Sequence, residues 1–312
     1  MIIMHTLPKT SDLSQDLLHW IADAVGPGTT VETVHRLKGA TSSTLYAVDA
    51  ARNGHRVELV LRRFTNREWL AEEPDLALHE AESLHMARRA GVSAPELVAI
   101  DQRSEQDGIP ILLMTRLPGT VELLPDDLDG WLHRLAEAIL PLHSLDAAEF
   151  GWRYASYNDV TQLKAPGWSS CPDLWERAIE IVNGPWPGTP TCFIHRDYHP
   201  TNVLWQETRI SGIVDWVNAC RGPASVDLSH CRGNLKSLYG VEIANRFLNV
   251  YQSLVGGDFE HHPYWDLSSV IGVLPGPPDV YPPWIEFGVD SLNKRIMAER
   301  ADEYLVSVMA RF

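Results

Sequence analysis

The chain has 312 residues, of which 45% are hydrophobic and 21% charged, so it can bury a sizeable core and is not disordered in bulk. Its 26 Lys and Arg residues against 41 Asp and Glu residues give a formal net charge of -15, with no basic run, which argues against a nucleic-acid partner. A cationic or neutral partner fits this charge better. No apolar run approaches about 18 residues, so we expect no membrane partner.

The amino terminus and the cysteines indicate a compartment. The first residues, MIIMHTLPKTSDL, have neither the basic region nor the apolar region of a signal peptide. Four cysteines form no CxxC pair and no metal-ligand spacing, which is ordinary for a reduced intracellular chain. We therefore expect a cytoplasmic protein, either a monomer or a homodimer.

The amino-terminal part predicts a small antiparallel sheet with one helix. Short stretches rich in β-branched and aromatic residues predict five strands, at 31–37, 43–50, 56–64, 96–100 and 111–117. Asn53-Gly54 between the second and third strands is a strong hairpin signal, because both turn positions tolerate φ > 0. A helix is predicted from about 75 to 90, ending at Gly91.

The carboxy-terminal part changes to a mostly helical pattern. Periodic apolar residues predict helices at roughly 127–144, 173–182, 240–255 and 290–310. Leu117-Pro118-Gly119 reads as a hinge between the two parts. The expected organisation is therefore a β-rich lobe over 1–117 and a helical lobe over 118–312.

The most informative stretch is FIHRDYHPTNVLW, residues 193–205. It contains H-R-D-x-x-x-x-N, the pattern of the catalytic loop of protein kinases. Phosphoryl transfer needs a carboxylate that orients the attacking hydroxyl and accepts its proton, and Asp197 is the candidate base. It also needs hard oxygen ligands for Mg²⁺, and the amide oxygen of Asn202 is one.

A second magnesium ligand is predicted from the hairpin that follows. Residues 203–205 and 209–214 read as two short strands, and Asn202 and Asp215 flank them. Cross-strand neighbours lie about 4.5–5.5 Å apart, so one divalent ion could touch both side chains. An isolated H-R-D would more often be a His and an Asp that bond a loop backbone; the combination with Asn202 and Asp215 favours a functional site.

The amino-terminal lobe is expected to hold the nucleotide. The loop 37–44 lies where a phosphate-covering loop belongs, and Ser42 and Ser43 are candidate phosphate contacts, with an ordinary polar turn as the equal alternative. Backbone groups of the segment from Met114 to Arg116 are candidates for contacts with a purine edge.

Arg62 occupies the place of the strand lysine of kinases, and Arg63 is the alternative. Glu80 on the following helix is the expected partner that holds the cation toward the phosphates. Glu82 lies about 200° around the helix from Glu80 and cannot share its face. A plain surface glutamate remains the alternative reading for each.

These elements together resemble the aminoglycoside phosphotransferase family, which includes choline, homoserine and macrolide kinases and has a protein-kinase-like, two-lobed α+β fold. The likeness is carried by 193–205, by ISGIVDWVNACRGPASVDLSH (210–230), and more weakly by 78–98 and 112–119. It implies an ATP or GTP donor, Mg²⁺, Asp197 as base, and Asn202 and Asp215 as metal ligands. It also implies that Asp227 supports the catalytic loop, and we expect His195 to do the same.

The acceptor implied by the resemblance is a small molecule with a hydroxyl group, such as an aminoglycoside-like antibiotic, bound by the carboxy-terminal lobe. Candidate carboxylates for a cationic acceptor are Asp159, Asp173, Glu176, Asp266 and Glu286, each with a solvated surface charge as the alternative. The rival hypothesis is a kinase-like nucleotide-binding protein that catalyses no transfer, because the usual lysine is replaced by arginine.

Overall fold

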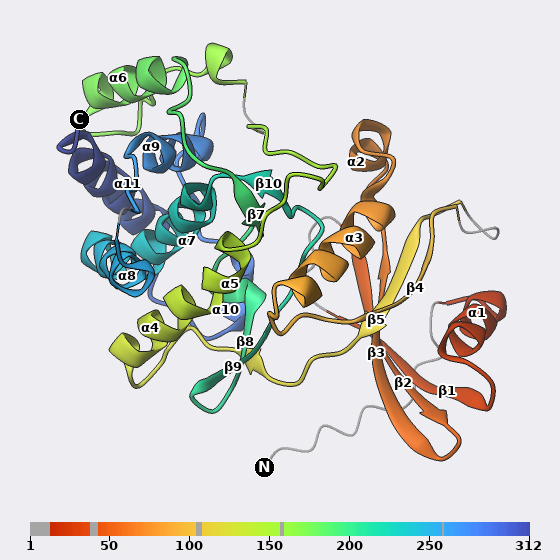
Figure 1. Cartoon of the computed structure of the whole chain (residues 1–312). Coiled ribbons are helices and arrows are strands. Elements are labelled where there is room, and N and C mark those ends of the chain that lie inside the picture. The colour runs from red at the N-terminus through yellow and green to blue at the C-terminus, as the bar shows by residue number, and fades with distance from the viewer. Residues whose placement is uncertain (1–12, 38–42, 104–107, 157–158, 258) are drawn as a thin grey trace. The chain divides into compact units, whose positions relative to one another are not determined.

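The computed structural model describes residues 13–37, 43–103, 108–156, 159–257 and 259–312. The chain forms two compact units, Met1–Arg88 with Ala94–Leu117, and Arg89–Ser93 with Pro118–Phe312 (Figure 1). Within the described residues, no helix combines the length and the apolar character needed to cross a membrane.

The first unit contains a five-stranded antiparallel sheet of order β1-β2-β3-β5-β4. Its strands are β1 Thr29–Arg36, β2 Thr44–Arg52, β3 His55–Arg63, β4 Leu97–Asp101 and β5 Ile111–Thr115. Asn53 and Gly54 have φ angles of 50° and 81° and close a two-residue turn that pairs Arg52 with His55. The hairpin predicted from these two residues is therefore confirmed.

Helices accompany this sheet on both faces. Side chains alternate along a strand, so Leu61 and Arg62 of β3 point to opposite faces. Leu61 belongs to a core cluster with Leu17 and Ile21 of helix α1, Gln15–Val25. Arg62 meets helix α3, Leu76–Arg89, on the other face. The short helix α2, Arg67–Glu72, was not predicted.

The second unit is mostly helical (Figure 1). Its helices are α4 Leu128–Ala138, α5 Leu140–His143, α6 Pro172–Val182, α7 Ala224–Tyr239, α8 Val241–Val255, α9 Tyr264–Val270, α10 Pro282–Glu286 and α11 Lys294–Met309. The helical pattern predicted at roughly 127–144 is present as two helices, α4 and α5, because Pro141 has no N–H to continue the ladder of α4 and instead lies in the first turn of α5.

Five short strands of this unit form two small sheets. They are β6 Thr120–Val121, β7 Cys192–Ile194, β8 Val203–Gln206, β9 Arg209–Ile213 and β10 Cys220–Gly222. One sheet has the order β6-β8-β9 and the other pairs β7 with β10. The predicted hairpin after Asn202 is present as β8 and β9, with a positive φ of 53° at Glu207 in its turn.

A buried charge network joins α7, α9 and α11. Asp266 of α9 is fully buried and accepts hydrogen bonds from Arg232, from Arg311 at 2.7 Å and from Tyr304 at 2.9 Å. His261 Nε2 lies 3.0 Å from the same carboxylate. The suggestion that Asp266 holds an acceptor is therefore wrong, because its carboxylate is fully buried and is already bound by side chains of the same unit.

Candidate active site

The loop that carries Asp197 begins where strand β7 ends, at Ile194. Ile194 pairs with Cys220 of β10, and helix α7 begins soon afterwards at Ala224. The pairing of β7 with β10 therefore brings the amino-terminal turn of α7 to the beginning of the loop.

Asp227, in that first turn, anchors the loop. Its carboxylate is fully buried and accepts the backbone N–H of His195 at 2.9 Å and of Arg196 at 2.6 Å. Nε2 of His143 lies 3.1 Å from the same carboxylate. Arg196 has a left-handed φ of 69°, an uncommon conformation for a residue with a side chain. The two charge-assisted bonds help to hold the backbone in this conformation.

His195 also ties the loop to the strand that leads to Asp215. Its ring nitrogen Nε2 lies 3.0 Å from the carbonyl oxygen of Val214, and the side chain is fully buried. Both residues that were expected to support the loop, His195 and Asp227, thus contact backbone around it.

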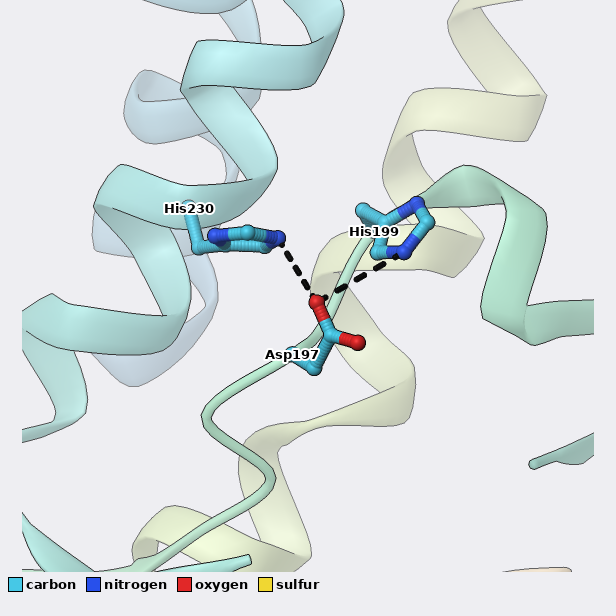
Figure 2. A group of neighbouring side chains, drawn as sticks. All are labelled: Asp197, His199 and His230. Atoms are coloured by element: carbon cyan, nitrogen blue, oxygen red, sulfur yellow. Dashed lines mark ion pairs between the residues drawn. The ribbon is translucent and has the colours of Figure 1, made fainter. Parts of the chain in front are cut away.

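The carboxylate of Asp197 is held from two sides (Figure 2). Its Oδ1 lies 2.9 Å from Nε2 of His230 on α7 and 3.7 Å from Nε2 of His199. Asn202 donates its side-chain amide to the carbonyl oxygen of Asp197 at 2.9 Å and to Oδ2 at 3.4 Å. Asp197 and Asn202 are therefore joined by hydrogen bonds through both the backbone and the side chain of Asp197.

The surroundings favour the charged form of Asp197. Burial alone would raise the pKa of Asp197, but the hydrogen bond from His230 and the nearby imidazoles hold it below its ordinary value. Burial lowers the pKa of His199 to about 4, so this ring is neutral at neutral pH. An ionised carboxylate of this kind can orient a hydroxyl by accepting its hydrogen bond.

Asp215 lies just beyond the end of the β8–β9 ladder. Val203 pairs with Ile213, and Val214 donates its backbone N–H to the carbonyl oxygen of Asn202 at 2.9 Å. Asp215 therefore directly follows the residue whose backbone bonds to Asn202. Asp215 has a φ of 69°, and its charge acts on His199.

The residues present fit a Mg²⁺ ion. Because Asn202 uses its NH₂ group toward Asp197, its amide oxygen is the atom turned to other partners. That oxygen and the carboxylate of Asp215 are hard donors, the kind that Mg²⁺ prefers. Asn202 and Asp215 are the residues that would hold the ion.

In the first unit, Arg62 and Glu80 form a buried pair. Nε of Arg62 lies 3.3 Å from Oε2 of Glu80, and the two side chains are 3% and 0% exposed. Glu82 is exposed and instead lies 3.8 Å from His85. Arg63, the alternative to Arg62, is half-buried. Arg62 is therefore the arginine whose partner is the expected glutamate.

The other predicted nucleotide contacts have less defined surroundings. Ser43 is buried, and Ser42 lies outside the described residues. Met114 pairs with Val60 inside the sheet. Arg116 donates its backbone N–H to the carbonyl oxygen of Glu58 at 2.9 Å, so a purine contact through this N–H would break a sheet bond. The other backbone groups of the segment from Met114 to Arg116 stay a prediction.

Two residues of the site were not predicted. His199 was part of the motif, but nothing in the sequence fixed the direction of its ring. His230 follows Asp227 by three residues on a helix, so the two share a face one turn apart. This spacing is the signal that could have found His230, once Asp227 had been placed beside the loop.

Comparison with known proteins identifies relatives of the chain. The model of the family described as "Phosphotransferase enzyme family" matches residues 33–264. The homoserine kinase of Xanthobacter autotrophicus is 27% identical over 221 residues, 65% of this chain and 64% of the relative. The match thus spans slightly less than two thirds of that relative's length.

Solved structures share the fold at low identity. The macrolide 2'-phosphotransferase MphH from Brachybacterium faecium has a TM-score of 0.58 at 18% identity, over 94% of this chain and 98% of that one. A thermostable mutant of the aminoglycoside phosphotransferase APH(4)-Ia, in a ternary complex with AMP-PNP and hygromycin B, has a TM-score of 0.60 at 15% identity, over 95% and 98%. The predicted protein-kinase-like α+β fold is confirmed.

Proposed function

Because the chain belongs to the phosphotransferase enzyme family, we propose that it transfers the γ-phosphoryl group of ATP or GTP to a hydroxyl of a small acceptor. The observation that carries the proposal is the contact between Asn202 and Asp197, at 2.9 Å and 3.4 Å, next to a carboxylate at Asp215. This arrangement combines one acceptor of a hydroxyl proton with two hard oxygen donors, the groups that phosphoryl transfer requires.

The chemistry follows from these positions. The acceptor oxygen attacks the γ-phosphorus in line, the bond from that phosphorus to the bridging oxygen breaks, and the nucleoside diphosphate leaves. Asp197 orients the hydroxyl and takes its proton as the new bond forms. Asn202 and Asp215 would hold Mg²⁺, which would neutralise charge on the phosphate oxygens.

The buried Arg62–Glu80 pair supports a nucleotide role for the first unit. A guanidinium that is fixed by a carboxylate presents its donors in one orientation, as a phosphate contact requires. We propose that Arg62 takes the part of the usual lysine. The charge stays positive, while the planar fork changes the contact geometry.

We further propose that the acceptor carries an amino group as well as a hydroxyl. Homoserine is the substrate in the name of one relative, and hygromycin B is bound in one structural neighbour. Tyr281 lies near the site, because the centre of its ring is 6.5 Å from that of His199. A net charge of -15 also favours a cationic acceptor over an anionic one.

A panel of acceptors tests the proposal. Homoserine, hygromycin B, another aminoglycoside, a macrolide, choline and two amine-free alcohols, glucose and glycerol, are incubated with Mg²⁺ and either ATP or GTP, and each product is analysed by mass spectrometry. The proposal expects a phosphorylated product from at least one amino-bearing alcohol, and none when Mg²⁺ is chelated. Products from amine-free alcohols alone would contradict the proposed acceptor class.

The rival function, nucleotide binding without transfer, is favoured by the replacement of lysine with Arg62. The two functions are separated by thermal melting with nucleotide, with and without Mg²⁺, beside the acceptor panel. A magnesium-dependent rise in melting temperature without any product would favour the binding protein.

A further inference from the structure

Asp197, His199 and His230 form a compact group of metal-binding side chains (Figure 2). Each offers one ligand atom, and these atoms lie within 4.8 Å of one another. The Nε2 atoms of both imidazoles face the same carboxylate oxygen, at 3.7 Å for His199 and 2.9 Å for His230. The group draws on two elements, the catalytic loop and helix α7.

The donor types distinguish this group from the proposed magnesium ligands. Two imidazole nitrogens with one carboxylate oxygen suit Zn²⁺, whereas Mg²⁺ prefers oxygen alone. Zn²⁺ binds such atoms at about 2.0–2.2 Å, so ligand atoms around a tetrahedral ion lie about 3.3 Å apart. The observed separations of 2.9 Å and 3.7 Å lie on either side of that spacing, and all three ligand atoms lie within 4.8 Å of one another.

The surroundings of His199 resemble those of a metal ligand. Its second ring nitrogen, Nδ1, lies 2.7 Å from the hydroxyl of Thr201. When Nδ1 donates to that hydroxyl, Nε2 presents its lone pair toward Asp197, and the ring orientation is fixed. The side chain of His199 is 9% exposed and that of His230 is 38% exposed, so the group is sheltered on one side and open to an incoming ion on the other.

We propose that Asp197, His199 and His230 bind a Zn²⁺ ion, and that this ion blocks phosphoryl transfer. The first part is a metal site distinct from the one at Asn202 and Asp215. The second part rests on the proposed function, because it requires Asp197 to be the group that orients the acceptor. A carboxylate oxygen bonded to Zn²⁺ is no longer available to the hydroxyl.

Binding is tested without nucleotide, by isothermal titration calorimetry of the full chain with Zn²⁺ in the presence of excess Mg²⁺. We expect one Zn²⁺ per chain, and a loss of affinity of at least about 100-fold for His230→Ala and for Asp197→Asn. Thr201→Ala should weaken binding by about 10- to 100-fold. His133→Ala, which removes an exposed imidazole on α4, is the matched control and should bind as the parent does. Thermal melting checks that each variant is folded.

Two results overturn the site: no binding by the parent, or equal affinity in the parent and His230→Ala. Inhibition is measured separately. For each protein, the rate of phosphoryl transfer with Zn²⁺ is divided by the rate of the same protein without Zn²⁺. The parent should be inhibited reversibly by Zn²⁺, and His230→Ala should need far more Zn²⁺ for the same loss. If Zn²⁺ binds as expected but no acceptor is ever phosphorylated, the metal site stands and the proposed function fails.

Discussion

Nε2 of His230 lies 2.9 Å from Oδ1 of Asp197, although the two residues are far apart in the sequence. Asp227, one turn earlier on the same helix, accepts the backbone N–H groups of the residues just before Asp197. Helix α7 therefore holds both the backbone of the loop and the carboxylate that projects from it. The orientation of Asp197 depends on a helix rather than on the loop alone.

The anchoring by Asp227 leads to a first prediction. Asp227→Asn should lower the free energy of unfolding by about 2–3 kcal/mol, because the new NH₂ group faces a backbone donor where a charged acceptor stood. Turnover should fall as well, since the loop loses its position. Urea unfolding measures the first effect and initial rates the second.

Asp173→Asn is the matched control for the unfolding measurement of this prediction. Asp173 is also an acidic residue in the first turn of a helix, α6, but it is exposed. Its replacement removes the same favourable interaction with a helix dipole, worth about 0.3–1 kcal/mol, without touching the loop. Equal losses in both variants would mean that Asp227 acts only through the dipole of α7.

The proposed magnesium ligand Asp215 gives a second prediction. Asp215→Asn keeps the size of the side chain and tolerates the φ of 69°, but it removes the charge. We expect the affinity for nucleotide in the presence of Mg²⁺ to fall by about 10- to 100-fold, by analogy with other losses around bound metals. Affinity without Mg²⁺ should not fall. Calorimetric titrations of nucleotide with and without Mg²⁺ measure both affinities. An equal loss of affinity in the two conditions would exclude a role of Asp215 in metal binding.

The nucleotide role of Arg62 is tested by Arg62→Lys with Arg63→Lys as its control. Alanine is a poor choice at Arg62, because it leaves the buried Glu80 unpaired, at a cost of about 3–5 kcal/mol. Lysine keeps the charge and loses the planar fork. The KM for the nucleotide should rise in Arg62→Lys and stay unchanged in Arg63→Lys. Equal effects would show that the arginine next along the strand contributes as much.

The buried network around Asp266 predicts a dependence of stability on pH. Burial alone would raise the pKa of Asp266, but the charges of His261, Arg232 and Arg311 hold it below its ordinary value. A carboxyl whose pKa is lowered by folding stabilises the protein above its unfolded pKa of about 3.9, and this contribution is lost as the pH falls below that value.

The variant Asp266→Asn isolates this contribution. At pH 7 its free energy of unfolding should be lower than that of the parent by about 3–5 kcal/mol, because Arg232 is left buried without its partner charge. The difference from the parent should shrink as the pH is lowered through about 4 and below. Chemical unfolding across this range measures it, and a difference that does not change with pH would show that the carboxylate carries no net stabilising charge.

Local patterns predicted the hairpins and the Arg62–Glu80 contact, but not every short element. The turn at Asn53-Gly54 and the strands around Glu207 follow from neighbours in the sequence. Strands β7 and β10 contain three residues each, too few for a periodic signal. Helix α2 has six residues and was missed for the same reason.

Contacts between distant segments account for the rest. Nothing in the sequence near Asp197 indicates that His230 would reach it, because that contact depends on the pairing of β7 with β10 and the direction of α7. Asp266 was an acceptor candidate because a carboxylate can hold an ammonium group, with a solvated surface charge as the alternative. Its partners come from α7, from His261 and from the carboxy-terminal segment, and they make it a core residue.

The central claim is that Asp197 orients the acceptor hydroxyl for phosphoryl transfer. The most direct measurement compares kcat for the parent and Asp197→Asn with the best acceptor of the panel, together with the affinity of each for the magnesium nucleotide. We predict a loss in kcat of roughly 10²-fold or more in the variant, with nucleotide still bound. A variant that phosphorylates the acceptor at the parental rate would contradict the account.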